Sequence, residues 1–179
     1  MAIQNLYGLT GAVSNPAIYA TDPIDFVAAA VDFETITLTW DETDIVGDSL
    51  RIQMSTGTEA DGTVATNGTE NVTGTGTVFK NYKQGDLILI DGETTRKIDL
   101  VIDDFHLRTD KYCSTTENAL AMVVCDGKWE ELVAPALGVG TLEVGGLDAL
   151  TTYFFRLSTH YRLKWSLWKV HYAVTTTAE

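Results

Sequence analysis

The sequence predicts an all-β protein, and three observations lead to that prediction. Several segments alternate apolar and polar residues with a period of two, which is the pattern of a half-buried strand. Clusters of glycine, asparagine and aspartate separate these segments at the short intervals typical of an antiparallel sandwich or barrel. The chain has 179 residues, of which 45% are hydrophobic, and this suits one compact domain or one domain that carries a small insertion.

The first two strands are expected between residues 22 and 41. Asp22–Ala30 begins with an aspartate and a proline that would suit the start of a short helix. We favour a strand there, because Val31–Phe33 continues toward the next strand without a helix stop signal. Thr35–Trp40 then alternates strictly and places an isoleucine, a leucine and the tryptophan on one face, with threonines on the other.

The same alternation recurs in two later segments, and a last strand is expected near the C-terminus. The apolar positions are Leu50, Ile52 and Met54 in one segment and Tyr153, Phe155 and Leu157 in the other, and the last strand covers Tyr172–Thr177. Two sheets that pack these apolar faces together would form a sandwich.

The middle of the chain is longer than a plain sandwich requires. About 75 residues separate Ser55 from Leu132, and they contain short apolar runs joined by tight turns. Asp91–Gly92 lies between two such runs and is a strong hairpin signal. We expect these runs to form a small barrel. The side chains expected to point into it are Leu87, Leu89, Ile98, Leu100 and Ile102.

Residues 1–22 are rich in glycine, threonine, asparagine and alanine, with scattered apolar side chains such as Leu6 and Tyr7. Such a segment has little to pack against by itself. It either frays or forms an arm that becomes ordered against a neighbouring subunit.

The charge balance is acidic and uneven along the chain. Twelve Lys and Arg stand against 25 Asp and Glu, and the formal net charge of −13 argues against a nucleic-acid binder, whose affinity depends on basic clusters. Residues 1–50 hold eight acidic side chains and no Lys or Arg, whereas from residue 150 onward four basic side chains are opposed only by Glu179. Such asymmetry is an argument about association rather than about fold.

No motif in the sequence points to an enzyme, a cofactor or a metal site. The three histidines form no His-Glu-x-x-His pattern, and neither a Gly-x-Ser-x-Gly elbow nor a phosphate loop with its lysine is present. Cys113 and His106 could act as nucleophile and base, but no third group orients them. Cys113 and Cys125 lack the spacing of a zinc site, and acidic pairs such as Asp103–Asp104 are expected to be solvated turn residues.

No apolar run approaches the roughly 20 residues that span a bilayer, and residues 1–7 lack the basic and apolar regions of a secretory signal. We therefore expect a chain that folds in the compartment where it is made, without a membrane partner. Two cysteines in a protein made inside a cell are expected to stay reduced.

Aromatic side chains are densest near the C-terminus, where seven fall within about 20 residues. On alternating strands, half of them would face the core and half the outside. Exposed members could anchor a protein interface, where tryptophan, tyrosine and arginine are enriched, or stack on sugar rings. We favour core plus protein interface, because basic residues lie among them. The seven are Tyr153, Phe154, Phe155, Tyr161, Trp165, Trp168 and Tyr172.

The order of these strands and of their anchor residues resembles the fibronectin type III domain. Trp40 closes the second strand, and Leu147 precedes Tyr153 as in that family's Leu-x-x-x-x-x-Tyr segment. The resemblance implies that the leucine fills the sandwich and that the tyrosine hydroxyl ties the loop to its own strand by a hydrogen bond. Trp165–Ser166 and Val174–Thr177 fall where the family has its last hairpin.

Residues 71–109 resemble a mini-domain that recurs in virion proteins of tailed bacteriophages. The shared order is a Thr-Gly-Thr-Gly-Thr run, an aromatic residue, Gly-Asp, an apolar strand, a glycine, a further strand and a leucine. The two resemblances together imply a sandwich with an insertion in one of its loops. The expected parts are an N-terminal arm over 1–22, a fibronectin type III-like or immunoglobulin-like sandwich over 23–58 and 132–179, and an inserted small β-barrel-like subdomain over 59–131.

The resemblance implies a non-enzymatic structural protein of a tailed-phage virion, in the tail, the connector or the head surface, made in the host cytoplasm. Its partners would be copies of itself and other virion proteins, with acidic side chains of one copy facing basic and aromatic side chains of the next. The expected interface residues are Asp32, Glu34, Asp41 and Glu42 on the acidic side, Arg162, Lys164, Trp165, Trp168 and Lys169 on the basic side, and Leu6 and Tyr7 in the arm. The alternative is a carbohydrate- or receptor-binding adhesion module on a phage fibre or a cell surface, with exposed tryptophans stacked on a glycan.

Overall fold

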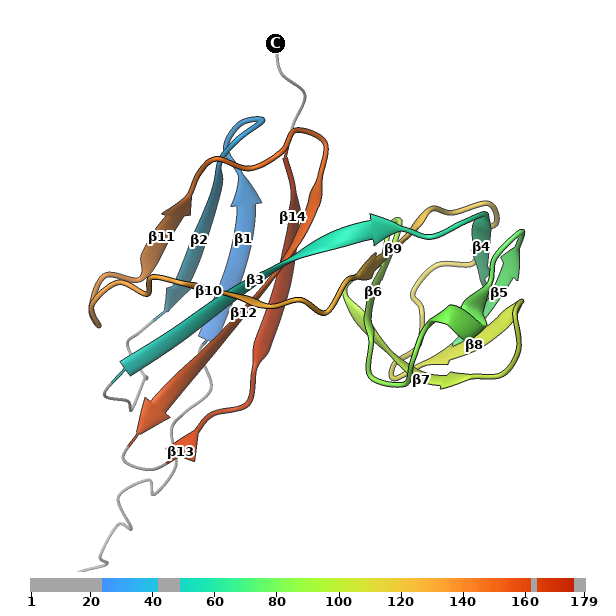
Figure 1. Ribbon diagram of the computed structural model, residues 1–179. Coiled ribbons are helices and arrows are strands. Elements are labelled where there is room, and N and C mark those ends of the chain that lie inside the picture. The colour runs from blue at the N-terminus through green and yellow to red at the C-terminus, as the bar shows by residue number, and fades with distance from the viewer. Residues whose placement is uncertain (1–23, 42–48, 162–163, 176–179) are drawn as a thin grey trace, which may run out of the picture.

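The computed structural model describes residues 24–41, 49–161 and 164–175. Within these ranges the regular structure consists of β-strands and one short 3₁₀ helix, so the prediction of an all-β fold is confirmed. Figure 1 shows a sandwich built from both ends of the chain and, beside it, a smaller body built from the middle. The expected arm over residues 1–22, with Leu6 and Tyr7, lies outside the described residues.

Two antiparallel sheets form the sandwich. One holds three strands in the order β1-β2-β11. The other is centred on the pair of β3 and β12, with β10 beyond β3 and with β13 and β14 beyond β12. The bounds are β1 (Ile24–Ala30), β2 (Ile36–Asp41), β3 (Ser49–Glu59), β10 (Glu130–Leu132), β11 (Thr141–Val144), β12 (Thr152–Tyr161), β13 (Lys164–Trp165) and β14 (Lys169–Val174). The preference for a strand rather than a helix before Val31 is thus confirmed.

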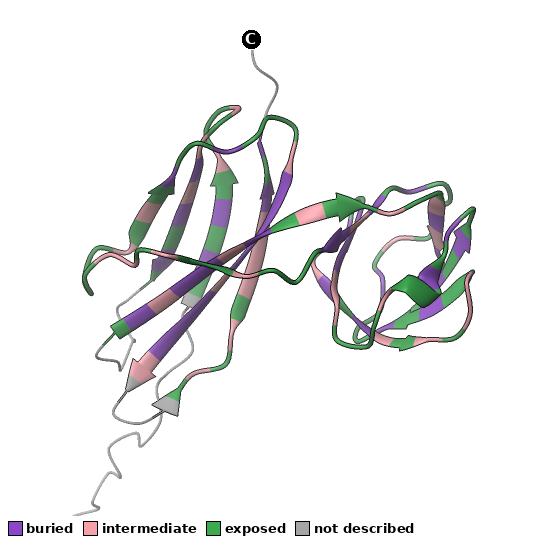
Figure 2. Cartoon of the chain, in the orientation of Figure 1, coloured by how far each residue is buried: buried purple, intermediate pink, exposed green. Residues whose placement is uncertain are grey.

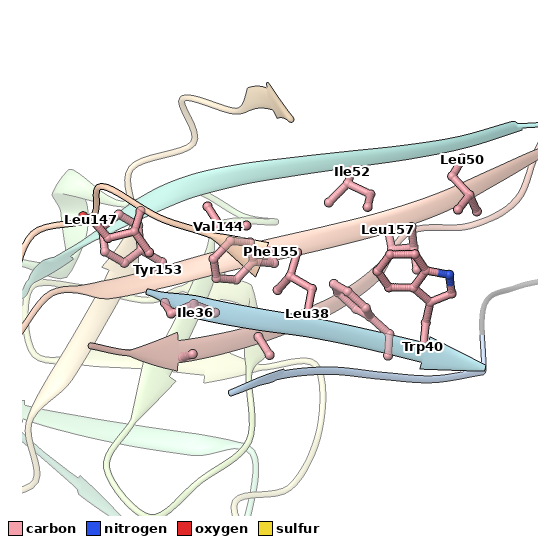
Figure 3. Close-up of a cluster of buried hydrophobic side chains, with 13 residues drawn as sticks. Ile36, Leu38, Trp40, Leu50, Ile52, Val144, Leu147, Tyr153, Phe155 and Leu157 are labelled. Atoms are coloured by element: carbon pink, nitrogen blue, oxygen red, sulfur yellow. The ribbon is translucent and has the colours of Figure 1, made fainter. Parts of the chain in front are cut away.

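The core of the sandwich follows the predicted alternation of apolar residues. Ile36, Leu38 and Phe155 have no exposed surface, and they lie in one cluster with Trp40 and Leu157. Figure 3 shows these side chains between the two sheets, with Ile36 at one end of the cluster and Trp40 at the other. Burial of such side chains is the main favourable contribution to folding.

The loop before β12 is fixed to that strand by a hydrogen bond. The backbone N–H of Asp148 donates to the hydroxyl oxygen of Tyr153 at 2.9 Å. Leu147, next to it, is buried in the core of the sandwich. The two local features expected of the Leu-x-x-x-x-x-Tyr segment are therefore confirmed.

The small body has a core of its own, and Figure 2 shows buried residues on the strands of both bodies. β3 leaves the sandwich and pairs with β9 over Gly57–Glu59, so one strand belongs to both bodies. The other elements are β4 (Thr63–Thr66), β5 (Asn71–Thr75), a 3₁₀ helix (Phe79–Asn81), β6 (Leu87–Ile90), β7 (Arg96–Val101), β8 (His106–Thr109) and β9 (Met122–Cys125). The predicted Asp91–Gly92 hairpin is confirmed by the antiparallel pair of β6 and β7.

The expected orientation of β6 is wrong. Ile88 and Ile90 fill the small body, and both are fully buried. Leu87 and Leu89 instead face the sandwich and pack beside Phe154 of β12. β6 is apolar on both faces because both are covered, and a continuous apolar run does not show which face points inward.

The expected orientation of β7 is only partly correct. Ile98 is buried in the small body, as predicted, but Leu100 and Ile102 are 46% and 56% exposed. The pairing of β7 with β8 shifts register between Ile98 and Leu100. Such an irregularity adds a residue on one strand and reverses the faces that follow it.

The Thr-Gly-Thr-Gly-Thr run comprises the last three residues of β5 and the bend that follows at Gly76 and Thr77. The expected turn therefore covers only the end of the run. A Cβ atom on Gly74 would collide with the Thr77 hydroxyl and lie 2.8 Å from the ring of Phe79. Gly76 has a φ of 72°, which glycine adopts at no steric cost. The Thr77 hydroxyl donates to the carbonyl of Asp104 at 2.9 Å, and this fastens the turn to the β7–β8 hairpin.

Candidate functional site

One row of side chains crosses the outer face of the β3–β12 sheet. Val170, Arg156, Gln53 and Glu131 lie opposite one another on four neighbouring strands, β14, β12, β3 and β10. Alternation along β12 explains why Arg156 is outside, since Phe155 and its other odd-numbered neighbours fill the core. The sheet therefore presents polar and charged groups on the side away from the core.

The polar members of this row hold each other in place. Arg156 Nε donates to Gln53 Oε1 at 2.7 Å, and Gln53 Nε2 donates to Glu131 Oε2 at 2.7 Å. The same carboxylate accepts from Arg51 Nε at 3.0 and 2.9 Å. Both oxygens of Glu131 are thus directed at Arg51, while the hydrogen-bond partner of Arg156 among the described residues is the uncharged amide of Gln53.

Three tryptophans surround the two arginines. The guanidinium carbon of Arg156 lies 4.0 Å from the ring centroid of Trp129 and 4.4 Å from that of Trp168. The guanidinium carbon of Arg51 lies 5.6 Å from the ring of Trp168 and 6.0 Å from that of Trp165. These distances are within the range of cation–π attraction. We refer to Arg51, Trp129, Arg156, Trp165 and Trp168 as the tryptophan–arginine face.

A cleft opens beside this face, between the sandwich and the small body. One part of it, with a volume of about 220 Å³, is lined by Trp129, Arg156 and Trp168 from the sandwich side and by Lys97 from β7. An adjoining hollow of about 310 Å³ is also lined by Lys97 and Trp168. The two bodies therefore share one hollow surface in which both contribute side chains.

The electrostatics of the cleft are dominated by cations. Besides Arg156 and Lys97, the second hollow is lined by Arg96, Lys111 and Lys169. The acidic side chains that line the two hollows are Asp86 and Asp110. Arg96 is paired with the buried carboxylate of Glu93, so its charge is balanced within the small body. The other four cations against two acids make this a positive region on a protein whose formal net charge is −13.

The structure separates the acidic residues expected at the interface. Asp32 and Glu34 are exposed in the turn between β1 and β2, and the Glu34 carbonyl accepts from Leu147 N–H at 3.0 Å. Asp41 is exposed at the opposite end of β2, where it is the last residue of the strand. Glu42 lies outside the described residues. The four therefore do not form one patch among the described residues, because a strand separates Asp41 from the turn.

The structure gathers most of the basic and aromatic interface residues. Lys164 and Trp165 form β13, Trp168 precedes β14, and Lys169 begins β14 with its side chain exposed. Trp165 is 48% exposed and contacts His160, with 4.8 Å between the ring centroids. Arg162 lies outside the described residues.

Sequence reasoning missed the members of this face that come from elsewhere in the chain. Arg51 and Arg156 occupy the outward positions of strands that alternate clearly, so their side of the sheet was predictable. Trp129 lies in the connection between β9 and β10, and no local pattern indicates its contact with Arg156. Phe154 was expected on the outer face, and the small body buries it completely there.

Other candidate chemistry is not assembled in the described part of the chain. Cys113 and Cys125 are free and buried, and burial raises the pKa of both thiols. His106 is exposed and its Nδ1 lies 2.9 Å from Asp103 Oδ1, so its bonding partner is a turn carboxylate. Among the described residues, no group of three or more His, Cys, Asp or Glu side chains could hold a metal ion.

Comparison with protein-family models and with curated proteins finds no match for this chain. The described residues include no helix with the length and apolar character needed to cross a membrane. The candidate site therefore rests on its own geometry: a rigid face of indole and guanidinium groups, bordered by a positive cleft. Indole and guanidinium groups are enriched at the centres of protein interfaces.

Proposed function

We propose that this chain is a non-enzymatic structural component of a tailed-bacteriophage virion, in the tail, the connector or the head surface. It assembles through contacts with copies of itself and with other virion proteins. The observation that carries the assembly proposal is the tryptophan–arginine face, in which Trp165 is exposed and the other four side chains are half-buried. Indole and guanidinium groups that contact one another at a surface are the usual anchors of protein interfaces. The phage context is supported by the resemblance of residues 71–109 to the virion mini-domain.

The placement of charge supports head-to-tail contact. The turn with Asp32 and Glu34 lies at one end of the sandwich, and β13 with Lys164 and Trp165 lies at the other (Figure 1). Two different patches that bind each other generate a ring when the rotation closes and a filament when it does not. Charge would steer the encounter, and burial of indole rings would stabilise the product.

A glycan-binding role is less well supported by the same face. Trp168 has two guanidinium groups within 5.6 Å of its ring centroid, and Trp165 has His160 against it. A sugar ring stacks on an uncovered aromatic face, and these contacts cover part of that area. Loss of glycan binding in Trp165→Ala or Trp168→Ala, with the fold intact, would be the result that favours the adhesion module.

The assembly proposal is tested by reversing three basic side chains together, Arg162, Lys164 and Lys169, each to Glu. We expect the purified variant to unfold at the same denaturant concentration as wild type and to be absent from purified particles, as measured by mass spectrometry of the virion. A matched control reverses Lys80, Lys83 and Arg108, which are exposed on the small body. It changes the net charge equally and should enter particles normally.

Normal incorporation of the first variant would contradict the charge-matching mechanism. Failure of both variants would mean that total charge, not the end of the sandwich, decides assembly. Either result would contradict the proposal that copies bind one another head to tail.

A further inference from the structure

Arg156 is held in a position from which it can donate hydrogen bonds to an anion. Its guanidinium lies between the rings of Trp129 and Trp168, with centroid distances of 4.0 and 4.4 Å. Its Nε is fixed by Gln53 Oε1 at 2.7 Å. A side chain packed against two indole rings and bonded at Nε has little rotamer freedom left, so a ligand that bonds to its terminal N–H groups loses little additional ordering entropy.

Arg156 has no direct hydrogen bond to a carboxylate among the described residues, although the charge of Glu131 lies near enough to act on it. The nearest acid of the row, Glu131, directs its two oxygens at Arg51. Burial, together with the nearby charge of Arg51, lowers the pKa of Arg156 from its ordinary value, yet a guanidinium in a protein keeps its proton. A partly desolvated cation without a directly bonded carboxylate is a configuration that an incoming anion would stabilise.

The cleft beside Arg156 favours negative charge. Lys97, Lys111 and Lys169 line it from the opposite wall and from the start of β14. Two acids also line the cleft and keep their charge: Asp86 Oδ2 accepts from Lys83 N–H at 2.8 Å, and Asp110 Oδ1 accepts from Lys97 N–H at 2.9 Å. These hydrogen bonds fix the two carboxylates in place, and the cations of the lining outnumber them.

We propose that this cleft is a carboxylate-binding site, with the terminal N–H groups of Arg156 as its anchoring donors, and that its occupant is an acidic side chain from a second copy of the chain. A carboxylate fits a guanidinium edge through two parallel hydrogen bonds. The occupant follows from charge complementarity, because the first 50 residues of each copy hold eight acids and no base. This inference rests on the assembly proposed above and identifies the pocket in which one copy binds the next.

The exposed turn between β1 and β2 is the segment of the second copy that fits best. Its Glu34 side chain is exposed, and Asp32 uses Oδ1 to accept the Glu34 N–H at 2.9 Å, which holds the turn in shape. The turn lies at an end of the sandwich, where it can enter a cleft on a neighbour (Figure 1). The carboxylate of Glu34 would then meet Arg156, with Asp32 near the lysines.

The test titrates the full chain with a capped peptide of residues 31–35 and follows indole fluorescence, since Trp129 and Trp168 flank Arg156 and the peptide contains no tryptophan. The control peptide carries Asp32→Asn and Glu34→Gln. We expect the acidic peptide to bind, the amide peptide to bind at least tenfold more weakly, and Arg156→Gln to weaken binding of the acidic peptide at least tenfold. Arg156→Lys should weaken it too, because charge remains but the planar fork is lost. Arg108→Gln, an exposed arginine of the small body, should leave binding within twofold.

Glucuronate and inorganic phosphate are titrated in parallel. Tighter binding of glucuronate than of the peptide would overturn the proposed occupant and indicate an acidic sugar. Equal binding of the acidic peptide by wild type and by folded Arg156→Gln, or no binding at all, would overturn the site. Incorporation into particles separates this proposal from the assembly proposal. If Arg156→Gln is incorporated normally while the variant with Arg162, Lys164 and Lys169 reversed is excluded, the cleft is not the binding site and the assembly proposal still holds.

Discussion

Glu93 is the most fully bonded acid of the small body, and its side chain has no exposed surface. Oε2 accepts from Arg96 Nη2 at 2.7 Å and from the Ser114 hydroxyl at 3.1 Å. Oε1 accepts from the backbone N–H of Thr115 at 2.7 Å and from its hydroxyl at 2.8 Å. One carboxylate thus joins the turn after β6 to the segment after β8, and this explains why the sequence can place an acid inside a barrel.

We predict that Glu93 makes the stability of the small body fall in acid. Burial by itself would raise the pKa of Glu93, but the hydrogen bonds from Thr115 and Ser114 outweigh it and lower the pKa below 4.5. A carboxyl with a lowered pKa contributes stability that is present above its ordinary pKa and lost as the pH falls through the folded value. Urea unfolding of wild type between pH 7 and pH 3 should show a steep loss below about pH 4.5.

Glu93→Gln is the matching variant, because it removes the charge and leaves Arg96 buried without an ion pair. We expect a loss of about 3 kcal/mol in the free energy of unfolding at pH 7 and a shallower dependence on pH than wild type. Parallel pH curves for the two proteins would show that another carboxyl is responsible.

At the scale of elements, β7 has one apolar residue before its register shift that is buried and one after it that is exposed. Ile98 is almost fully buried in the small body, whereas Leu100 is 46% exposed. We expect Ile98→Ala to lower the free energy of unfolding by about 2–4 kcal/mol and Leu100→Ala to lower it by less than about 0.5 kcal/mol. Equal losses, measured by denaturant titration, would mean that Leu100 also faces the core.

β7 and its neighbours show which features of the fold can be predicted from the sequence. Strand type and approximate limits follow from alternation and turn residues. The core-facing sides of β2, β3 and β12 follow from the sequence because their outer faces are polar, apart from Phe154 on β12. β6 has no polar face, so its orientation depends on the sandwich that covers Leu87 and Leu89. The shift within β7 carries no sequence signal that we can identify.

At the scale of the whole molecule, β3 crosses from one body to the other at Gly57. A Cβ atom there would lie 2.5 Å from Val123 Cγ1 and 3.0 Å from the ring of Phe154. Gly57→Ala should therefore destabilise the protein by about 1–3 kcal/mol, because neighbours on both strands would have to move. Gly145→Ala is the control, since no atom lies within 4 Å of its added carbon. Calorimetry should show a lower transition temperature for the first variant only, and equal transition temperatures would contradict the tight crossing.

The candidate site is also formed by segments that are far apart in the chain, and for this reason the sequence predicted only part of it. Trp165, Trp168 and Lys169 were predictable as a basic and aromatic group because they are close in the chain. Arg156 and Trp129 meet only when β10 returns beside β3 and the connection before it crosses the sheet. A composition argument could identify the kinds of side chain at the interface, but not which of them stack.

The central claim is that the acidic end of one copy binds the basic end of the next copy in a particle. Exchanging the charges of the two ends tests this claim most directly. One variant carries Asp32→Lys and Glu34→Lys, a second carries Arg162, Lys164 and Lys169 each changed to Glu, and a third carries both sets. Incorporation into purified virions is measured for each. We predict that the first two are excluded and that the third regains part of the wild-type incorporation, because its reversed ends match each other while Arg156, Lys97 and Lys111 of the cleft remain positive. Incorporation of either single-ended variant, or exclusion of the third while it remains folded, would contradict the account.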